Sequence, residues 1–153
     1  MVDKVAFLGC GSWGAALGSL LAKKGIQVNF WHRDANIIKG MAKSQEHYLM
    51  PSVKFPNTVL FFSNLEEAVK SIETYIIAVP SQNVREIISK VQPQISKSTC
   101  IINIAKGIEN HTLMTMSEVI NDVLGNKGNI VTLSGPSHAE EVIDNQPTAI
   151  VSA

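Results

Sequence analysis

Three glycines spaced as G-x-G-x-x-G stand between an apolar run and a segment with helical periodicity. The run at residues 4–8 predicts a buried strand, and Gly9, Gly11 and Gly14 follow it. In this setting the first glycine permits a tight turn, the second lets the backbone approach a pyrophosphate, and the third lets helix and strand pack closely. The helix N-terminus offers N–H groups to phosphates, so the pattern predicts a dinucleotide site rather than an ordinary glycine-rich turn.

Short apolar runs alternate with helical segments along the whole chain. Such runs, apolar enough to be covered on both faces, predict an α/β fold: a Rossmann-like, doubly wound, mostly parallel sheet of order 3-2-1-4-5-6. The stretch 46–57 contains two prolines and little periodicity, which predicts a loop. The expected strands are residues 4–8, 27–31, 59–62, 75–79, 99–104, 130–133 and 148–151. The expected helices are 13–24, one bearing residues 37–41, one starting at a capping box at 63–66, 84–91, 113–124 and 139–142.

Composition limits the classes of partner. The 153 residues predict one domain, and 13 basic residues balance 13 acidic ones, which removes a global electrostatic argument for nucleic acid or membrane binding. No apolar stretch approaches the ~20 residues that span a bilayer, and the first strand begins without a signal peptide. Cys10 and Cys100 are expected to be small buried residues without disulfide or metal. We therefore expect a cytoplasmic protein that binds no metal.

The residues after the second expected strand bear on cofactor choice. An acidic residue there favours NAD, and a basic one favours the 2′-phosphate of NADP. The chain has His32, Arg33 and Asp34 in succession. We favour NADP over NAD, because pairing of Arg33 with a phosphate is well directed. The alternatives are that Asp34 contacts the ribose or caps the next helix, and that Arg33 is a solvated surface charge.

Three further segments follow strands at the carboxyl edge of the sheet, where open α/β sheets bind ligands. Pro80 and Ser81 follow the fourth strand and are expected to line the crevice near the cofactor, although a proline stop and a serine cap explain them equally. Lys106 follows the fifth strand, where the alternative is a solvated lysine. The loop 134–138 precedes a short helix and predicts phosphate or substrate contacts, the alternative being a turn capped by Ser137.

Taken together, these motifs resemble one family, the bacterial-type NAD(P)-dependent glycerol-3-phosphate dehydrogenases. The specific blocks are A-K-G-I-E at residues 105–109 and S-G-P-S-x-A-x-E-V at 134–142, in order after G-x-G-x-W-G at 9–14. The resemblance implies interconversion of dihydroxyacetone phosphate and sn-glycerol 3-phosphate with NAD(P)H, which supplies phospholipid synthesis. It implies these contacts: Ser12, Trp13, His32, Arg33 and Ala139 to the cofactor, Lys106 to cofactor and substrate, and Gly135 and Ser137 to the substrate.

The chain departs from the family pattern in several places. Residues 48–56 carry an inserted Met50, and His138 stands where the family commonly has Phe, which favours packing over catalysis. Family members carry a second, helical domain with a general acid/base lysine and most ligands of the substrate phosphate, and they are expected to be homodimers. Residues 1–153 are therefore expected to be the nucleotide-binding domain of a longer protein, with no catalytic acid or base of their own.

Two other classes of function fit part of this pattern. A non-catalytic, redox-sensing dinucleotide module would share the glycine motif but would have no need of Lys106 or the 135–137 loop. A dehydrogenase for another small hydroxy acid would share the fold. Trp13 within the glycine motif and the A-K-G-I-E block favour glycerol 3-phosphate.

Overall fold

A seven-stranded sheet forms the centre of the protein, in the order β3-β2-β1-β4-β5-β6-β7. The structure is a computed structural model that describes residues 2–125, 127–144 and 146–153. Neighbouring strands are parallel, except that β7 pairs with β6 in the antiparallel sense. The predicted mostly parallel sheet and its strand order are confirmed. The strands are β1 (Lys4–Leu8), β2 (Gln27–Trp31), β3 (Val59–Phe62), β4 (Thr74–Ile77), β5 (Cys100–Asn103), β6 (Asn129–Ser134) and β7 (Val151–Ser152).

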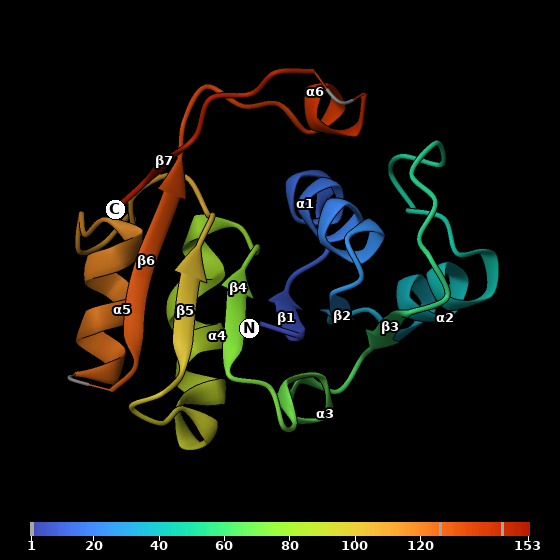
Figure 1. Ribbon diagram of the computed structural model, residues 1–153. Helices are drawn as coiled ribbons and strands as arrows, with labels where there is room; N and C mark the ends of the chain where they lie inside the picture. The colour runs from blue at the N-terminus through green and yellow to red at the C-terminus, as the bar shows by residue number, and fades with distance from the viewer. Residues whose placement is uncertain (1, 126, 145) are drawn as a thin grey trace.

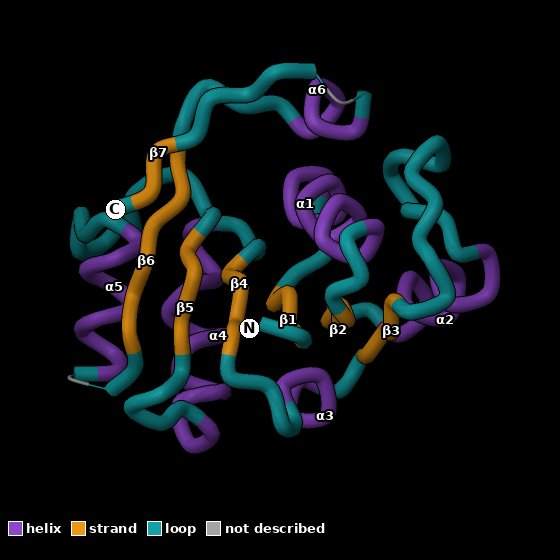
Figure 2. Tube along the Cα trace, viewed as in Figure 1, coloured by secondary structure: helices purple, strands orange, loops and turns teal. Residues whose placement is uncertain are grey.

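Helices cover both faces of the sheet, as Figures 1 and 2 show. One side carries α3, α4 and α5, and the other carries α1 and α2, with α6 packed against α1. Single 3₁₀ turns at Ser81–Asn83 and Gln92–Gln94 flank α4. The helices are α1 (Ser12–Lys23), α2 (Ala35–Ser44), α3 (Leu65–Val69), α4 (Val84–Val91), α5 (Met116–Leu124) and α6 (Ala139–Ile143).

The alternation of side chains along each strand creates two separate cores. In β1, Ala6 and Leu8 join the buried cluster under α3, α4 and α5, whereas Val5 and Phe7 join the cluster under α1 and α2. Successive residues of a strand point to opposite faces, so an apolar run of this kind is buried on both sides. This is the reason that the strands lack the polar alternation of a half-exposed sheet.

Several element boundaries differ from the expectation. Helix α5 begins at Met116 because Thr115 is its N-cap, in a capping box with Glu118, rather than at residue 113. Asn64, and not Ser63, caps α3 by accepting a hydrogen bond from the Glu67 amide. The last strand covers Val151–Ser152 instead of residues 148–151. The two helix shifts reflect which side chain reaches the free amides, a choice that spacing alone leaves open.

The two cysteines are both free thiols, as expected, but only Cys10 is fully buried. Cys100 is half-buried at the start of β5, so its expected burial was wrong. Burial raises the pKa of the Cys10 thiol to about 12, which keeps it protonated. None of the helices in the described ranges is long and apolar enough to cross a membrane.

Candidate functional site

The glycine turn between β1 and α1 has the geometry that its three glycines predict. Gly9 adopts a φ of +114°, and a Cβ there would lie 2.5 Å from the Ala78 carbonyl oxygen. A Cβ on Gly14 would lie 2.8 Å from the Cβ of Ala78, so the helix crosses β4 at close range. In contrast, a Cβ on Gly11 would meet nothing within 4 Å. The open space is therefore at the middle glycine, where a ligand can approach the backbone.

The N-terminus of α1 faces this open space. Gly11 is the N-cap and makes no side-chain cap hydrogen bond, and the first turn contains no acidic residue. The first amides of a helix lack partners within the helix, so those of Ser12 and Trp13 are available to a ligand. Together with the helix dipole they form an anion-binding end.

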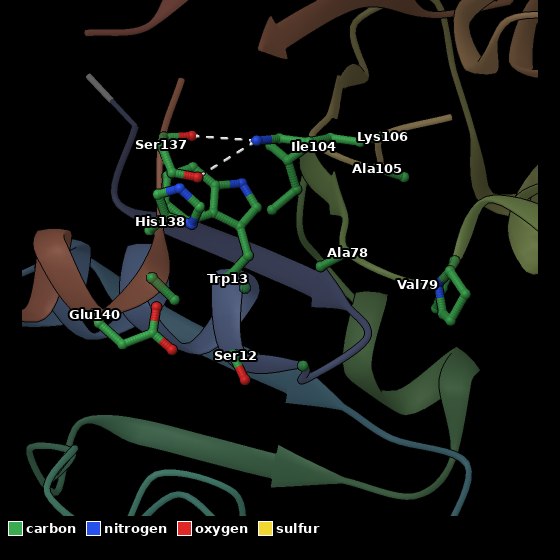
Figure 3. Close-up of a pocket in the computed structure, with 14 residues that line it drawn as sticks. Ser12, Trp13, Ala78, Val79, Ile104, Ala105, Lys106, Ser137, His138 and Glu140 are labelled. Atoms are coloured by element: carbon green, nitrogen blue, oxygen red, sulfur yellow. Dashed lines mark hydrogen bonds between the residues drawn. The ribbon is translucent and has the colours of Figure 1, made fainter. Parts of the chain in front are cut away.

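A cavity of ≈ 390 Å³, the Lys106 cavity, opens beside this turn. It lies at the carboxyl ends of β1, β4 and β5, the edge at which the sequence placed the site. Figure 3 shows its side chains, which come from four separate segments of the chain. The lining residues are Gly11, Ser12, Trp13, Gly14, Ala78, Val79, Pro80, Ile104, Ala105, Lys106, Ser137, His138, Ala139 and Glu140.

Lys106 points across this cavity to the loop that follows β6 (Figure 3). Its Nζ donates to the carbonyl oxygens of Gly135 at 3.1 Å and of Ser137 at 3.4 Å, and lies 3.5 Å from Ser137 Oγ. The same ammonium lies 5.9 Å from the centroid of the Trp13 ring, within the range of a cation–π contact. The structure thus brings Trp13, Lys106, Gly135 and Ser137 together, although 29 residues separate the lysine from Gly135.

The loop after β6 is held by a close approach of the chain. A Cβ on Gly135 would lie 2.5 Å from the carbonyl oxygen of Ala149, so only glycine fits there. Ser137 is buried but does not cap α6, because the N-cap is His138, which makes no side-chain cap bond. His138 is exposed and lines the cavity, which contradicts its expected packing.

A second cavity, of ≈ 260 Å³, lies on the other side of the glycine turn; we call it the Arg33 cavity. Gly11, Ala78, Val79 and Pro80 line both cavities. The two cavities therefore adjoin each other at the glycine turn. Ser81 lines neither cavity and begins a 3₁₀ turn, for which Pro80 is the cap residue. The remaining lining residues are Gly9, Cys10, Trp31, His32, Arg33, Tyr48, Asn83, Glu86, Ile87 and Lys90.

Among the residues after β2, Asp34 caps a helix. Its Oδ1 accepts hydrogen bonds from the amides of Asn36 at 2.8 Å and Ile37 at 3.4 Å, which makes it the N-cap of α2. His32 Nδ1 accepts from the Asp34 amide at 3.1 Å. Arg33 is exposed and lines the cavity. Of the alternatives for Asp34, capping is the one that the structure bears out.

The loop at residues 46–57 contributes to the site, which its sequence did not reveal. Tyr48 lines the Arg33 cavity, and its ring centroid is 5.7 Å from that of His32. His47 is buried, and its Nε2 lies 3.0 Å from the carbonyl oxygen of Cys10 in the glycine turn. Because that oxygen only accepts, Nε2 carries the hydrogen. The aromatic residue at 48 was the one available signal for this contact.

A partly buried ion pair supports the segment that carries Lys106. Arg85 on α4 binds Glu109 in a bidentate manner, with Nε–Oε1 at 2.8 Å and Nη2–Oε2 at 2.9 Å. Hydrogen bonds from Arg85 and then from Thr112 lower the pKa of Glu109 to about 2. Arg85 also binds Asp122 on α5. The glutamate of the A-K-G-I-E block is therefore a tether for the loop.

The described ranges hold no group of three or more His, Cys, Asp or Glu side chains arranged to bind a metal ion. The arrangement instead offers helix amides, a lysine ammonium and an arginine around one path. These are groups that bind phosphates and polarise a carbonyl oxygen.

Comparison with known proteins gives a consistent family. A family model described as "NAD-dependent glycerol-3-phosphate dehydrogenase N-terminus" matches residues 4–153. Glycerol-3-phosphate dehydrogenase [NAD(P)+] of Syntrophomonas wolfei is 40% identical over 155 residues, covering 99% of this chain. The protein of the same name from Thermoanaerobacter sp. is 43% identical over 150 residues, covering 98%. A crystal structure of glycerol-3-phosphate dehydrogenase from Coxiella burnetii superposes with a TM-score of 0.89, at 32% identity over 97% of this chain.

The chain spans about 45% of the length of each of these relatives. More distant structures share the fold alone; glycerol-3-phosphate dehydrogenase of Plasmodium falciparum superposes with a TM-score of 0.82 at 19% identity. Because the family model matches almost every residue, and the relatives are similar along the same stretch, the chain belongs to the family of NAD-dependent glycerol-3-phosphate dehydrogenase N-terminal domains.

Proposed function

We propose that this chain binds NAD(P)H along the path formed by the two cavities. The observation that carries the proposal is the shared lining at Gly11, Ala78, Val79 and Pro80, which joins the Arg33 cavity to the Lys106 cavity over the open helix N-terminus. The pyrophosphate would lie against Gly11 and the amides of Ser12 and Trp13. Adenosine would occupy the cavity with His32 and Arg33, and nicotinamide the cavity with Lys106 and Ala139.

NADP is the preferred cofactor in this proposal. Arg33 is an exposed cation in the cavity assigned to adenosine, and the acidic residue beside it is engaged as a helix cap. A guanidinium recognises a phosphate by charge-assisted hydrogen bonds. The names of the relatives, which give both NAD and NADP, are compatible with either cofactor.

Lys106, Gly135 and Ser137 would meet the substrate at the nicotinamide end. In the longer protein we propose interconversion of dihydroxyacetone phosphate and sn-glycerol 3-phosphate, the reaction of phospholipid supply, with hydride chemistry supplied by the cofactor. The ammonium of Lys106 would hydrogen-bond the substrate oxygen that gains negative charge on reduction. A helical second domain would supply the general acid/base lysine and the ligands of the substrate phosphate.

The alternative of a redox-sensing module is disfavoured by Lys106. A sensor needs no cation at the proposed nicotinamide end, yet the ammonium of Lys106 in that cavity is held by the carbonyl oxygens of Gly135 and Ser137 in one loop and lies near the Trp13 ring. A dehydrogenase for another hydroxy acid shares the fold, but the relatives similar along this whole chain carry the glycerol-3-phosphate name.

We also propose that the protein is cytoplasmic and that the full-length protein is a homodimer. Two free cysteines are compatible with a reducing compartment. The homodimer rests on the family resemblance alone. Light scattering on the longer protein tests it, and a monomer at micromolar concentration would contradict it.

Cofactor binding is tested by titrating the chain with NADPH and NADH while following Trp13 fluorescence in a Trp31→Phe background. Gly11→Ala should weaken both cofactors by about tenfold, because its methyl group would occupy the pyrophosphate approach. This variant should fold, since φ at Gly11 is −78° and the added Cβ meets nothing. Gly40→Ala in α2, also an open position, is the matched control. A folded chain that shows no saturable binding at millimolar cofactor would refute the proposal.

A further inference from the structure

Two charged residues of α4 line the Arg33 cavity together with Arg33. Glu86 and Lys90 lie one helical turn apart, and Lys90 Nζ lies 2.5 Å from Glu86 Oε1. The hydrogen bond and charge of Lys90, with a smaller contribution from the charge of Arg33, lower the pKa of Glu86. The cavity thus holds two cations and one carboxylate, in addition to the imidazole of His32.

The fold usually places after β2 an acidic residue that contacts the ribose of the cofactor. The acidic residue at that position, Asp34, is committed to the cap of α2. Glu86 lines the Arg33 cavity from α4, a helix that the glycine motif does not include. Glu86 would repel a 2′-phosphate, and Lys90 would bind it as a second cation. Both residues lie on α4.

We propose that Lys90 is a second ligand of the 2′-phosphate of NADPH, beside Arg33, and that Glu86 is the counter-ion that this phosphate displaces. The inference rests on the proposed dinucleotide function. With NADH, Glu86 keeps its contact with Lys90, and the cavity retains a net charge of +1 from its one carboxylate and two basic side chains. With NADPH, the phosphate replaces the carboxylate as the partner of Lys90 and also pairs with Arg33.

The exchange requires little rearrangement. Glu86 and Lys90 are each 57% exposed, and an exposed ion pair of this kind contributes little to stability. Glu86 can therefore rotate toward solvent while Lys90 turns to the phosphate. The apolar wall of Ile87 and the ring of Tyr48 remain in place to hold the adenosine. Cofactor choice is then a competition between a protein carboxylate and a ligand phosphate for the same lysine.

The test measures dissociation constants of the chain for NADPH, NADH and 2′,5′-ADP, the last of which carries the phosphate without the nicotinamide. Lys90→Met should weaken NADPH and 2′,5′-ADP by about tenfold and leave NADH within about twofold. Glu86→Gln should tighten NADPH and 2′,5′-ADP by about threefold, because it removes the competitor. Lys97→Met and Glu67→Gln are matched controls, at exposed positions that line neither cavity.

The possible outcomes distinguish a failure of this inference from a failure of the proposed dinucleotide binding. If the wild-type chain binds NADH and NADPH but Lys90→Met weakens both equally, or Glu86→Gln weakens NADPH, the assignment of α4 is wrong and the dinucleotide site stands. If the folded wild-type chain binds neither cofactor, both the proposed function and this inference are wrong. Because both side chains are exposed, the variants should fold, which circular dichroism verifies.

Discussion

Lys106 is the residue with the largest expected effect on chemistry. In this structure three oxygens of one loop surround its ammonium, and the Trp13 ring lies beneath it. In the longer, active protein, Lys106→Met should lower kcat/KM for dihydroxyacetone phosphate by about a hundredfold or more, with a much smaller change in cofactor affinity. Steady-state kinetics and cofactor titration measure the two effects. Lys43→Met, at an exposed lysine in α2, is the control. Near wild-type activity of Lys106→Met would show that Lys106 does not act on the substrate.

His47 links pH to the stability of the glycine turn. Burial lowers its pKa, and its Nδ1 is buried without a hydrogen-bond partner in the described structure. A histidine with a lowered folded-state pKa contributes full stability above its unfolded value of about 6.5, and this stability is lost as the pH falls through the folded value. The melting temperature should therefore fall between about pH 7 and about pH 5.

His47→Gln separates this effect from general acid sensitivity. Its side-chain amide can still donate to the Cys10 carbonyl, but it does not titrate. The variant should lose less stability between these two pH values than the wild type, at about 1.4 kcal/mol for each unit by which the pKa is lowered. Identical slopes for wild type and His47→Gln would show that another group controls the transition.

At the scale of elements, the segment between β5 and α5 is held by α4. Arg85 binds Glu109, and Gln82 donates to the Ile108 carbonyl at 2.8 Å and accepts from the Asn110 amide at 3.0 Å. These contacts join α4 and the 3₁₀ turn before it to residues just after Lys106. The segment that carries the lysine is therefore anchored from this side of the sheet.

Glu109→Gln should loosen this segment without unfolding the sheet. A glutamine cannot form the bidentate ion pair with Arg85, so amide exchange at residues 106–114 should accelerate by about tenfold. Hydrogen–deuterium exchange followed by mass spectrometry measures this, with Glu67→Gln on α3 as the control. Since the pKa of Glu109 is lowered to about 2, the wild-type tether should persist well below pH 4.5 and be lost only as the pH approaches 2. Unchanged exchange in Glu109→Gln would leave Gln82 as the main anchor.

At the scale of the whole molecule, two cores on opposite faces of one sheet support the proposed binding path for a dinucleotide. The chain spans about 45% of its relatives, whose names describe a dehydrogenase. We expect the 153-residue chain to bind NADPH but to show no turnover of dihydroxyacetone phosphate. The reason is that the proposed acid/base lysine and phosphate ligands lie outside it. Absorbance at 340 nm in the presence of both compounds measures turnover. Robust activity of the isolated chain would contradict the proposal that the second domain supplies the acid/base lysine and the phosphate ligands.

Local pattern was sufficient for most of the fold and for the centre of the site. The period of apolar residues indicated each strand and helix of the sheet, and the glycine spacing indicated the turn. Boundaries moved by a few residues wherever two neighbouring side chains could serve as a cap, as with Ser63 and Asn64 before α3. The contribution of Tyr48 was missed because loop 46–57 has no period, and its path depends on contacts such as that of His47 with the glycine turn.

The sequence alone determined the fold class, the strand order and the position of the dinucleotide turn, because these follow from short-range rules of periodicity, backbone conformation and chain connection. Only the tertiary structure decided which distant groups share a cavity. It paired Arg85 with Glu109, brought Lys106 to the loop of Ser137, and placed Glu86 and Lys90 in the same cavity as Arg33. These contacts depend on how the helices cross the sheet and on the paths of the loops at its edge. Neither can be predicted from one segment of the sequence.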